Sequence, residues 1–431
     1  MKRGNIFLTH ISRLTFILRA LRYRNYRLFF FGQGVSLVGS WMQLVTVSWL
    51  VYRLTSSAFL LGVVAFASQV PAFIFSPFAG VLADRFNRKA ILMITQALAM
   101  VQAAILAYLA LFGIIRVWQI ITLSLAAGLI NAFDAPVRQA FVLDMVEDKK
   151  DLGNAIALNS LIFNSAKLIG SSLAGVLLVF INEGVCFLIN AISFLAVIIA
   201  LAAMKIKIGY RVHARSRVLD ELRDGFVYVG RHVPIRSILL LVTVLSLLGM
   251  SYMVLMPVIA KNILGGGAQT LGFLIGSIGL GALVGALYLA SRTQLAGLQD
   301  IIFWASVVFG AALVAFSFSR VFWISFFLMA IAGFSMIAQM VASNTLLQNL
   351  SEYSKRGRVL SFYTTAFMGM MPFGSLFAGA CAAKIGAPIT LCISGLLCVI
   401  AALFFGTKRK VLTAAIETVR KEEEPAPFLV P

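Results

Sequence analysis

Three ionisable residues lie within long apolar stretches of this 431-residue chain, namely Asp134, Arg138 and Lys167. A charge at the centre of a membrane costs roughly 2.5–3.5 kcal/mol on insertion scales, so each group needs a partner, water or a ligand. Asp134 and Arg138 are four residues apart, which places them on one face of a helix, and Pro136 loosens the helix between them. The pair is consistent with local neutralisation, with a gate, or with proton transport by Asp134.

Asp134 is also the candidate for proton coupling. Apart from Asp300 at the cytoplasmic end of the span 300–319, only the acids Asp134 and Glu183 fall outside the segments predicted to be cytoplasmic, and Glu183 lies in a predicted outer loop. Lys167 lies near the middle of its apolar run. It either meets an anionic or carbonyl-bearing substrate or pairs with Asp134, and the sequence leaves both possibilities open.

Uncharged polar residues also fall near the middle of several apolar runs. An amide in such a place more often bonds two helices together than binds a ligand, but several in one bundle indicate a central cavity. An aromatic residue with neighbouring methionines supplies an adaptable apolar wall. The predicted cavity residues are Gln43, Asn131, Asn164, Lys167, Tyr252 and Gln339.

The composition is that of a membrane protein. The chain is 61% hydrophobic and 12% charged, whereas a soluble domain carries about twice that charged fraction. The net charge of +20 comes from bases in short stretches between apolar runs. This pattern indicates membrane orientation and contact with anionic lipid, and not nucleic-acid binding. The four cysteines have no metal-ligand spacing and fall in or beside apolar runs, so they say nothing about a disulfide framework. We expect no metal and no cofactor.

Twelve apolar runs approach the ~20 residues that a helix needs to cross a membrane. The predicted spans are 27–52, 58–82, 90–113, 117–143, 153–181, 184–204, 236–260, 270–291, 300–319, 321–347, 358–383 and 388–407. They predict an all-α membrane protein with bundles at 27–204 and 236–407, joined by the polar linker 205–235. The remaining segments are a basic N-terminus, 1–26, and a tail, 408–431. Within the linker, Val218, Leu222, Phe226 and Val229 have the spacing of an amphipathic helix on the membrane surface.

The distribution of Lys and Arg predicts the orientation. The N-terminus, the even-numbered connections and the C-terminus, with the first residues of the adjoining spans, carry 29 of them, whereas five of the six odd-numbered connections carry one each and the sixth carries none. Because bases concentrate on the cytoplasmic side, both termini and the linker are predicted to be cytoplasmic. A multi-pass protein of the bacterial inner membrane is expected.

A repeated motif links the two predicted bundles. Gly170-Ser-Ser-Leu-Ala-Gly175 lies in the fifth span and Gly374-Ser-Leu-Phe-Ala-Gly379 in the eleventh. Small residues at this spacing permit close helix contact within a membrane. Their equivalent places indicate that the two six-helix halves are duplicates.

A short charged turn joins the second and third spans, at Gly80-Val-Leu-Ala-Asp-Arg-Phe-Asn-Arg-Lys-Ala-Ile-Leu92. This turn resembles the loop between helices 2 and 3 of transporters of the major facilitator superfamily. Asn87 stands where the family usually has Gly, and Asn also tolerates a left-handed backbone. The matching residues are Gly80, Leu82, Asp84, Arg85, Arg88 and Lys89.

Further segments resemble one branch of that superfamily, which holds enterobactin exporters and macrolide efflux proteins. They include Gly39-Ser-Trp-Met-Gln43, Asp134-Ala-Pro-Val-Arg-Gln139 and Leu255-Met-Pro-Val-Ile-Ala260. The resemblance runs from about Arg22 to Phe405. One departure is Gly170-Ser171, where many relatives have the Gly-Pro associated with antiport, so the coupling mode stays open.

The resemblance implies a gate. In relatives, an acid at the position of Asp134 meets an arginine of the helix 2–3 loop in the inward-closed state, which names Arg88 or Arg85. Asp84 is expected at the N-terminus of helix 11, near Arg358. The gating set is Gly80, Asp84, Arg85, Arg88, Lys89, Asp134 and Arg138.

Other classes of membrane protein fit the sequence less well. It has no G-x-x-x-x-G-K-[ST] motif for an ATP-driven pump, no buried nucleophile or metal cluster for an enzyme, and no filter motif for a channel. The sequence thus predicts a monomeric secondary transporter that exports a small amphipathic compound, siderophore-like or drug-like, with the proton gradient. The alternatives are an importer or facilitator of a small metabolite, and a transport-inactive sensor or scaffold.

Overall fold

The computed structural model describes residues 19–205, 226–290, 297–352 and 355–423, with side chains left undescribed at 76–85, 149, 251, 410 and 418–423. Twelve helices in this part of the chain are long and apolar enough to cross a membrane, which confirms the predicted number. These segments are helical because a membrane contains no water to form hydrogen bonds with backbone N–H and C=O groups. A helix pairs these groups within the segment itself.

The first six spans are single helices. They are α2 (Arg24–Thr55), α3 (Ala58–Arg85), α4 (Arg88–Leu111), α5 (Val117–Met145), α6 (Leu152–Phe180) and α7 (Glu183–Ala203). A 3-10 turn, η1 (Arg19–Arg22), precedes α2, and another, η2 (Lys149–Asp151), precedes α6.

Two of the second six spans are interrupted. The seventh consists of α9 (Val233–Leu247), η3 (Gly249–Ser251), α10 (Tyr252–Val258) and η4 (Ile259–Ile263), and the eleventh of α14 (Arg356–Thr364), η5 (Thr365–Gly369) and α15 (Met371–Ile385). Pro372 follows the interruption in the eleventh span, and its missing N–H explains the break. The other spans are α11 (Ala268–Ala290), α12 (Leu298–Phe318), α13 (Phe322–Leu350) and α16 (Ala387–Gly406).

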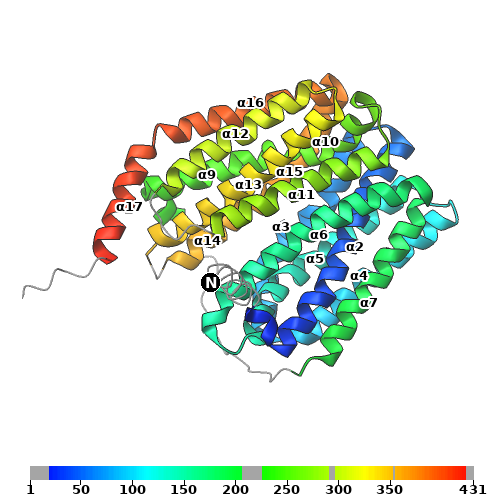
Figure 1. Cartoon of the computed structure of the whole chain (residues 1–431), viewed down its shortest axis with the longest axis horizontal. Helices are drawn as coiled ribbons and strands as arrows, with labels where there is room; N and C mark the ends of the chain where they lie inside the picture. The colour runs from blue at the N-terminus through cyan, green and yellow to red at the C-terminus, as the bar shows by residue number, and fades with distance from the viewer. Residues whose placement is uncertain (1–18, 206–225, 291–296, 353–354, 424–431) are drawn as a thin grey trace, which may run out of the picture.

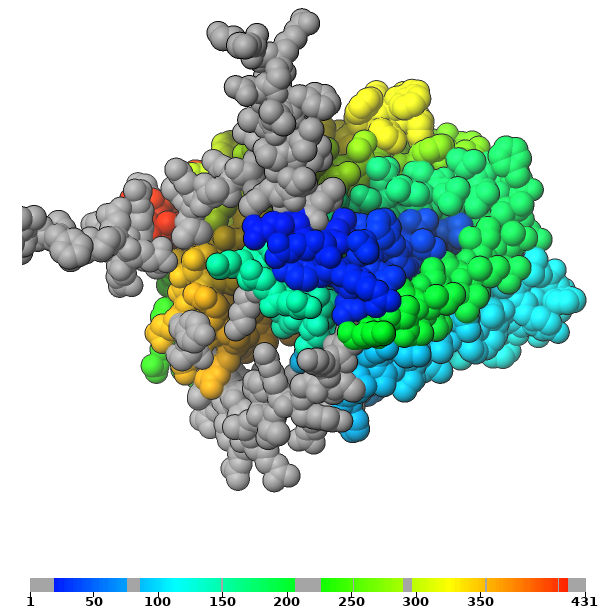
Figure 2. Space-filling model, turned by 60° about the horizontal axis from the view of Figure 1, so that its bottom comes forward, coloured from blue at the N-terminus to red at the C-terminus, as the bar shows by residue number. Residues whose placement is uncertain are grey.

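The helices pack as two halves, α2–α7 and α9–α16, which lie side by side (Figure 1). Within the first half, α7 packs against α2 and α4, and Figure 2 shows these helices adjacent on the surface. The halves meet along two pairs of helices, α6 with α11 and α3 with α15. We call the end where α2 begins and α16 ends the terminal face, and the other end the loop face.

The turn between α3 and α4 differs from the sequence prediction. Helix α3 continues to Arg85, so only Phe86 and Asn87 separate it from α4. Asn87 is not left-handed: its φ is −64°, and its side chain accepts hydrogen bonds from the backbone N–H groups of Lys89 and Ala90. It is the N-cap of α4, a position that Asn favours because its oxygen satisfies unpaired N–H groups.

The segment after the last span was predicted as a tail, but it contains a helix, α17 (Arg409–Glu423). Leu412 and Ile416, one turn apart, are buried against the second half. Arg409 forms an ion pair with Asp300 at the start of α12. In the linker, Val218 and Leu222 lie outside the described residues, whereas Phe226 is helical and 72% exposed.

Candidate functional site

The Asp134 carboxylate is buried between α4 and α5. Its Oδ1 accepts hydrogen bonds from Thr95 Oγ1 at 2.8 Å and from Gln96 Nε2 at 2.7 Å. Its Oδ2 lies 3.4 Å from Nε of Arg138, one turn along α5. Two donors from α4 and one cation therefore compensate this charge in the membrane, where an uncompensated carboxylate is unstable.

Arg88 has other partners in this conformation. Its guanidinium binds both oxygens of Asp144, at 3.1 and 3.0 Å, and the carbonyl oxygen of Ala140. Asp134 is instead paired with Arg138, the local pair that the spacing allowed. The pairing of Asp134 with Arg88 was predicted for a conformation closed at the terminal face, and it stays a prediction.

The rest of the predicted gating set lies at the α3–α4 turn. Gly80, Asp84 and Arg85 are in the last turns of α3, but their side chains lie outside the described part of the chain. Lys89 donates a hydrogen bond of 2.8 Å to the carbonyl oxygen of Met204. Because that carbonyl group follows α7, Lys89 fastens the turn to the end of the sixth span.

Lys167 lies in the middle of α6, and its ammonium group is 5.1 Å from the centroid of the Trp41 ring of α2. Trp41 in turn meets Phe163 edge to face, with 5.6 Å between ring centroids. A Cβ atom on Gly170 would come within 3.0 Å of the Trp41 Cβ and 2.3 Å of the Val38 carbonyl oxygen. The missing side chain at Gly170 thus lets α2 approach α6 and sets Trp41 beneath Lys167.

The first half holds three further predicted cavity residues. Gln43 is engaged at both ends of its amide, accepting from Asn190 and donating to Gln102, so it ties α2 to α7 and α4. Asn164 is buried and donates to the Ser160 carbonyl oxygen. Asn131 is exposed, and the structure describes no hydrogen bond of its side chain.

Tyr252 and Gln339 lie inside the second half, so the structure does not bring them together with Lys167. Tyr252 is fully buried and its ring packs edge to face on Phe309. Gln339 donates to Ser343 Oγ at 3.0 Å and lines a small pocket between α9, α12, α13 and η5. Ser246 and Phe309 line the same pocket, which is largely apolar.

Glycines bring the two halves into contact at the loop face. A Cβ atom on Gly175 of α6 would lie 3.0 Å from the Gly272 Cα of α11. A Cβ atom on Gly379 of α15 would lie 2.9 Å from the Gly62 Cα of α3. Helix backbones approach this closely only where both partners are small.

A hydrogen bond of 2.7 Å from Asn262 Nδ2 to the Tyr52 hydroxyl joins the halves at the loop face. The ammonium group of Lys261 lies 5.5 Å from the centroid of the same Tyr52 ring. Both contacts join α2 to η4, between the glycine pairs and solvent. They extend the contact between the halves to the edge of the membrane.

The contact between α6 and α11 does not continue to the terminal face. Ser171 and Asn164 on the α11-facing side of α6 are buried, whereas Ala157 and Gly153 on that side are exposed. A Cβ atom on Gly153 would meet nothing within 4 Å. Along α6 and α11, the described residues of the two halves therefore meet from the loop face to mid-span and not beyond it.

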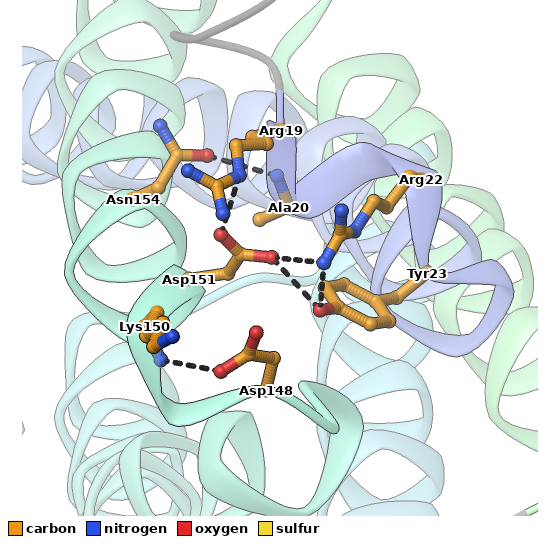
Figure 3. A network of polar contacts seen from close by, with 8 residues as sticks. All are labelled: Arg19, Ala20, Arg22, Tyr23, Asp148, Lys150, Asp151 and Asn154. Carbon is orange, nitrogen blue, oxygen red and sulfur yellow. Dashed lines mark hydrogen bonds and ion pairs between the residues drawn. The ribbon is translucent and has the colours of Figure 1, made fainter.

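A network of polar contacts around Asp151, which precedes α6, was not predicted from the sequence (Figure 3). Asp151 is 1% exposed and pairs with Arg19 Nε at 2.8 Å and with Arg22 at 2.7 Å. Its Oδ2 also accepts a hydrogen bond from the Tyr23 hydroxyl, and Asn154 accepts one from the Ala20 N–H. The network fastens η1 to α6, and the signal for it was a basic segment facing one acid at a helix start.

Among the residues described, no group of three His, Cys, Asp or Glu side chains is placed to hold a metal ion. The arrangement contains a compensated acid, Asp134, and a cation, Lys167, that pairs with none of the described carboxylates. Lys167 lies near the contact between α6 and α11.

A family model described as transmembrane secretion effector matches residues 17–429. The staphyloferrin A transporter of Staphylococcus aureus is 27% identical over 88% of this chain and 95% of that protein. Macrolide efflux protein A of Streptococcus pyogenes is 22% identical over 89% of this chain and 96% of that protein. The multidrug efflux pump Tap of Mycolicibacterium fortuitum is 24% identical over 81% of this chain and 87% of that protein.

Solved transporters share the fold. A bacterial homologue of the human lysosomal transporter Spinster, inward-facing and unoccupied, aligns with a TM-score of 0.67 and 15% identity, over 94% of this chain and 99% of that one. A POT family transporter aligns with a TM-score of 0.71 and 11% identity, over 90% of this chain and 97% of that chain. The match over almost the whole length shows that the chain belongs to the transmembrane secretion effector family, within the major facilitator superfamily of transporters.

Proposed function

We propose that the protein is a monomeric secondary transporter that exports a small amphipathic compound, siderophore-like or drug-like, by alternating access. The observation that carries this proposal is the contact between the halves, which is made at the loop face and to mid-span and is absent among the described residues beyond it. A bundle that closes at one face and opens at the other suits the rocking of two repeats about a central site.

The proposed orientation places both termini in the cytoplasm of a bacterial cell. The excess of Lys and Arg at the terminal face supports it, since bases concentrate on the cytoplasmic side. In this orientation the conformation described is open to the cytoplasm, where an exporter collects its substrate. The relatives that transport staphyloferrin A, macrolides and drugs support export.

The proposed energy source is the proton gradient, with Asp134 as the coupling acid. The carboxylate is held by Thr95, Gln96 and Arg138 in this conformation. Protonation removes the attraction to Arg138 and weakens the two accepted hydrogen bonds. Protonation of Asp134 therefore destabilises this arrangement of α4 and α5. Conformations that do not depend on an ionised Asp134 become relatively more populated.

Comparative profiling of a deletion strain tests the proposed function. Without the gene, one or more amphipathic compounds should fall in the medium and rise in the cells, or sensitivity to amphipathic drugs should increase. A plasmid copy should restore the wild-type profile, and the Gly175→Leu variant at equal abundance should not. An unchanged external profile combined with loss of uptake of a metabolite would contradict export and identify an importer.

A further inference from the structure

Lys167 is a partly buried cation in the middle of α6. It lies 15 residues after the first residue of α6 and 13 before the last, so its ammonium group is too deep to reach either membrane surface. Its described contact is the face of Trp41, and it forms no ion pair with the described carboxylates. A cation–π contact contributes about 0.5–2 kcal/mol, less than the insertion cost of a central charge.

The helix geometry directs Lys167 toward the junction of the halves and away from lipid. At 100° per residue, it lies between the side of α6 that meets α11, at Asn164 and Leu168, and the side that meets α2, at Gly170. Ile169, which is 53% exposed, is on the opposite side. A solute between α2, α6 and α11 therefore meets the ammonium group directly.

Access to this place is from the terminal face. Ile156 and Phe163 lie on the same side of α6 as Lys167, nearer that face, and are 58% and 45% exposed. Toward the loop face, the contact of Gly175 with Gly272 closes the path. Around Lys167 the described side chains thus offer apolar groups toward the terminal face, the ring of Trp41 and one positive charge.

We propose that Lys167, resting on Trp41, binds an anionic oxygen group of the transported compound, so that the substrate class is an amphipathic carboxylate or a similar organic anion. The ammonium group donates charge-assisted hydrogen bonds to the anion, and Trp41 and Phe163 contact its apolar part. The anion supplies a counter-charge that none of the described carboxylates gives Lys167. This inference rests on the proposed function because it names the substrate class of that transport.

The test uses two dyes with the same xanthene ring and opposite charge, namely anionic fluorescein and cationic rhodamine 123. Binding is measured by fluorescence anisotropy on the full chain in phosphatidylcholine nanodiscs. Wild type should bind fluorescein and should bind rhodamine 123 at least tenfold more weakly, since loss of a hydrogen bond to a charged group changes affinity about tenfold or more.

Lys167→Gln should lose fluorescein binding by about tenfold or more, whereas Lys167→Arg should retain it. Lys384→Gln is the matched control, because it removes an exposed lysine charge at the end of α15 and should leave binding unchanged. Equal binding of both dyes, preference for rhodamine 123, no fluorescein binding, or retention by Lys167→Gln would each overturn the inference.

Two further experiments distinguish the anion site from a lipid-binding site and test the proposed export separately. Phosphatidylglycerol in the nanodiscs tests a lipid headgroup as the occupant: if it abolishes fluorescein binding, the site belongs to lipid and the inference is wrong. Transport of fluorescein into energised inverted vesicles tests the proposed function separately. Binding that depends on Lys167 without any transport would support the anion site and contradict the exporter.

Discussion

Gly170 of α6 and Gly374 of α15 occupy equivalent places in the two halves. Each lies 18 residues after the first residue of its span, and each faces a carbonyl oxygen of the first helix of its own half. For Gly170 that oxygen belongs to Val38, and for Gly374 it belongs to Leu247. The two halves therefore use the same residue type at the same contact.

The partners across the interface are equivalent as well. Gly175 meets Gly272 and Gly379 meets Gly62, so the last glycine of each repeated motif faces the other half. The loop face is closed by one type of contact used twice. This symmetry is what duplication of a six-helix unit produces.

The charges do not follow this symmetry. Asp134 lies 17 residues after the start of α5, and the residue at that place in α13 is Gln339. Arg138 likewise corresponds to Ser343, to which Gln339 donates a hydrogen bond. By the same count, Met371 stands where α6 has Lys167.

Because the second half builds the same helix packing without Asp134, Arg138 or Lys167, the fold does not require these charges. A charge inside a membrane that packing does not need marks a place of function. The comparison supports the proposal that solute and proton bind in the first half and that the second half is a largely apolar frame.

The largest expected effect comes from the contact that the halves share. Gly175→Leu and Gly379→Leu should each reduce transport at least tenfold, since overpacking costs about 1–3 kcal/mol and prevents closure of the loop face. Thiol labelling of a cysteine placed at the loop face should increase in both variants. Gly153→Leu is the control on the same helix, because a Cβ atom there meets nothing within 4 Å.

A smaller effect is expected where the halves differ at the terminal face. Asp151 and Lys355 both precede the first residue of their spans, but of the two only Asp151 is buried and holds two arginines. Asp151→Asn should destabilise the protein by about 1–2 kcal/mol, because the arginines are partly solvated and the loss is screened. Thermal unfolding measures it, and Lys355→Asn should change stability less. An equal loss in both variants would contradict a special role for this network.

The smallest effect concerns a single bond at the loop face. Tyr52→Phe removes the hydrogen bond to Asn262 but retains the ring beneath Lys261. The closed conformation should lose about 1 kcal/mol, which shifts the balance of conformations about fivefold. Labelling of the same loop-face cysteine measures this shift. If labelling is unchanged, the glycine contacts alone hold the loop face closed.

The sequence predicted the spans and the repeated glycine motifs because both are written in local patterns. Runs of apolar residues define a membrane helix without reference to the rest of the chain. Gly170 to Gly175 and Gly374 to Gly379 are recognisable by spacing alone. What each glycine contacts became visible only when α11 and α3 were placed beside them.

The partners of the charged residues were not predictable in this way. Thr95 and Gln96 are almost forty residues from Asp134, and nothing local links them. Asp151 joins a segment more than a hundred residues earlier, through Tyr23. Asn87 was misread for a different reason: the comparison with a family glycine suggested a left-handed turn, but Asn also caps helices.

The central proposal is that protonation of Asp134 changes the conformation of the protein. A distance measurement tests this proposal without knowledge of the substrate. Spin labels are attached at positions 59 and 384, in place of Phe59 and Lys384, in a variant without the four native cysteines. Double electron–electron resonance then measures the distance between α3 and α15 at the loop face. Wild type should shift toward the longer distance as the pH falls, because protonation of Asp134 releases Arg138. Asp134→Asn should show the longer distance at every pH, without a shift. A pH-dependent shift in Asp134→Asn equal to that of wild type would contradict coupling through this carboxylate.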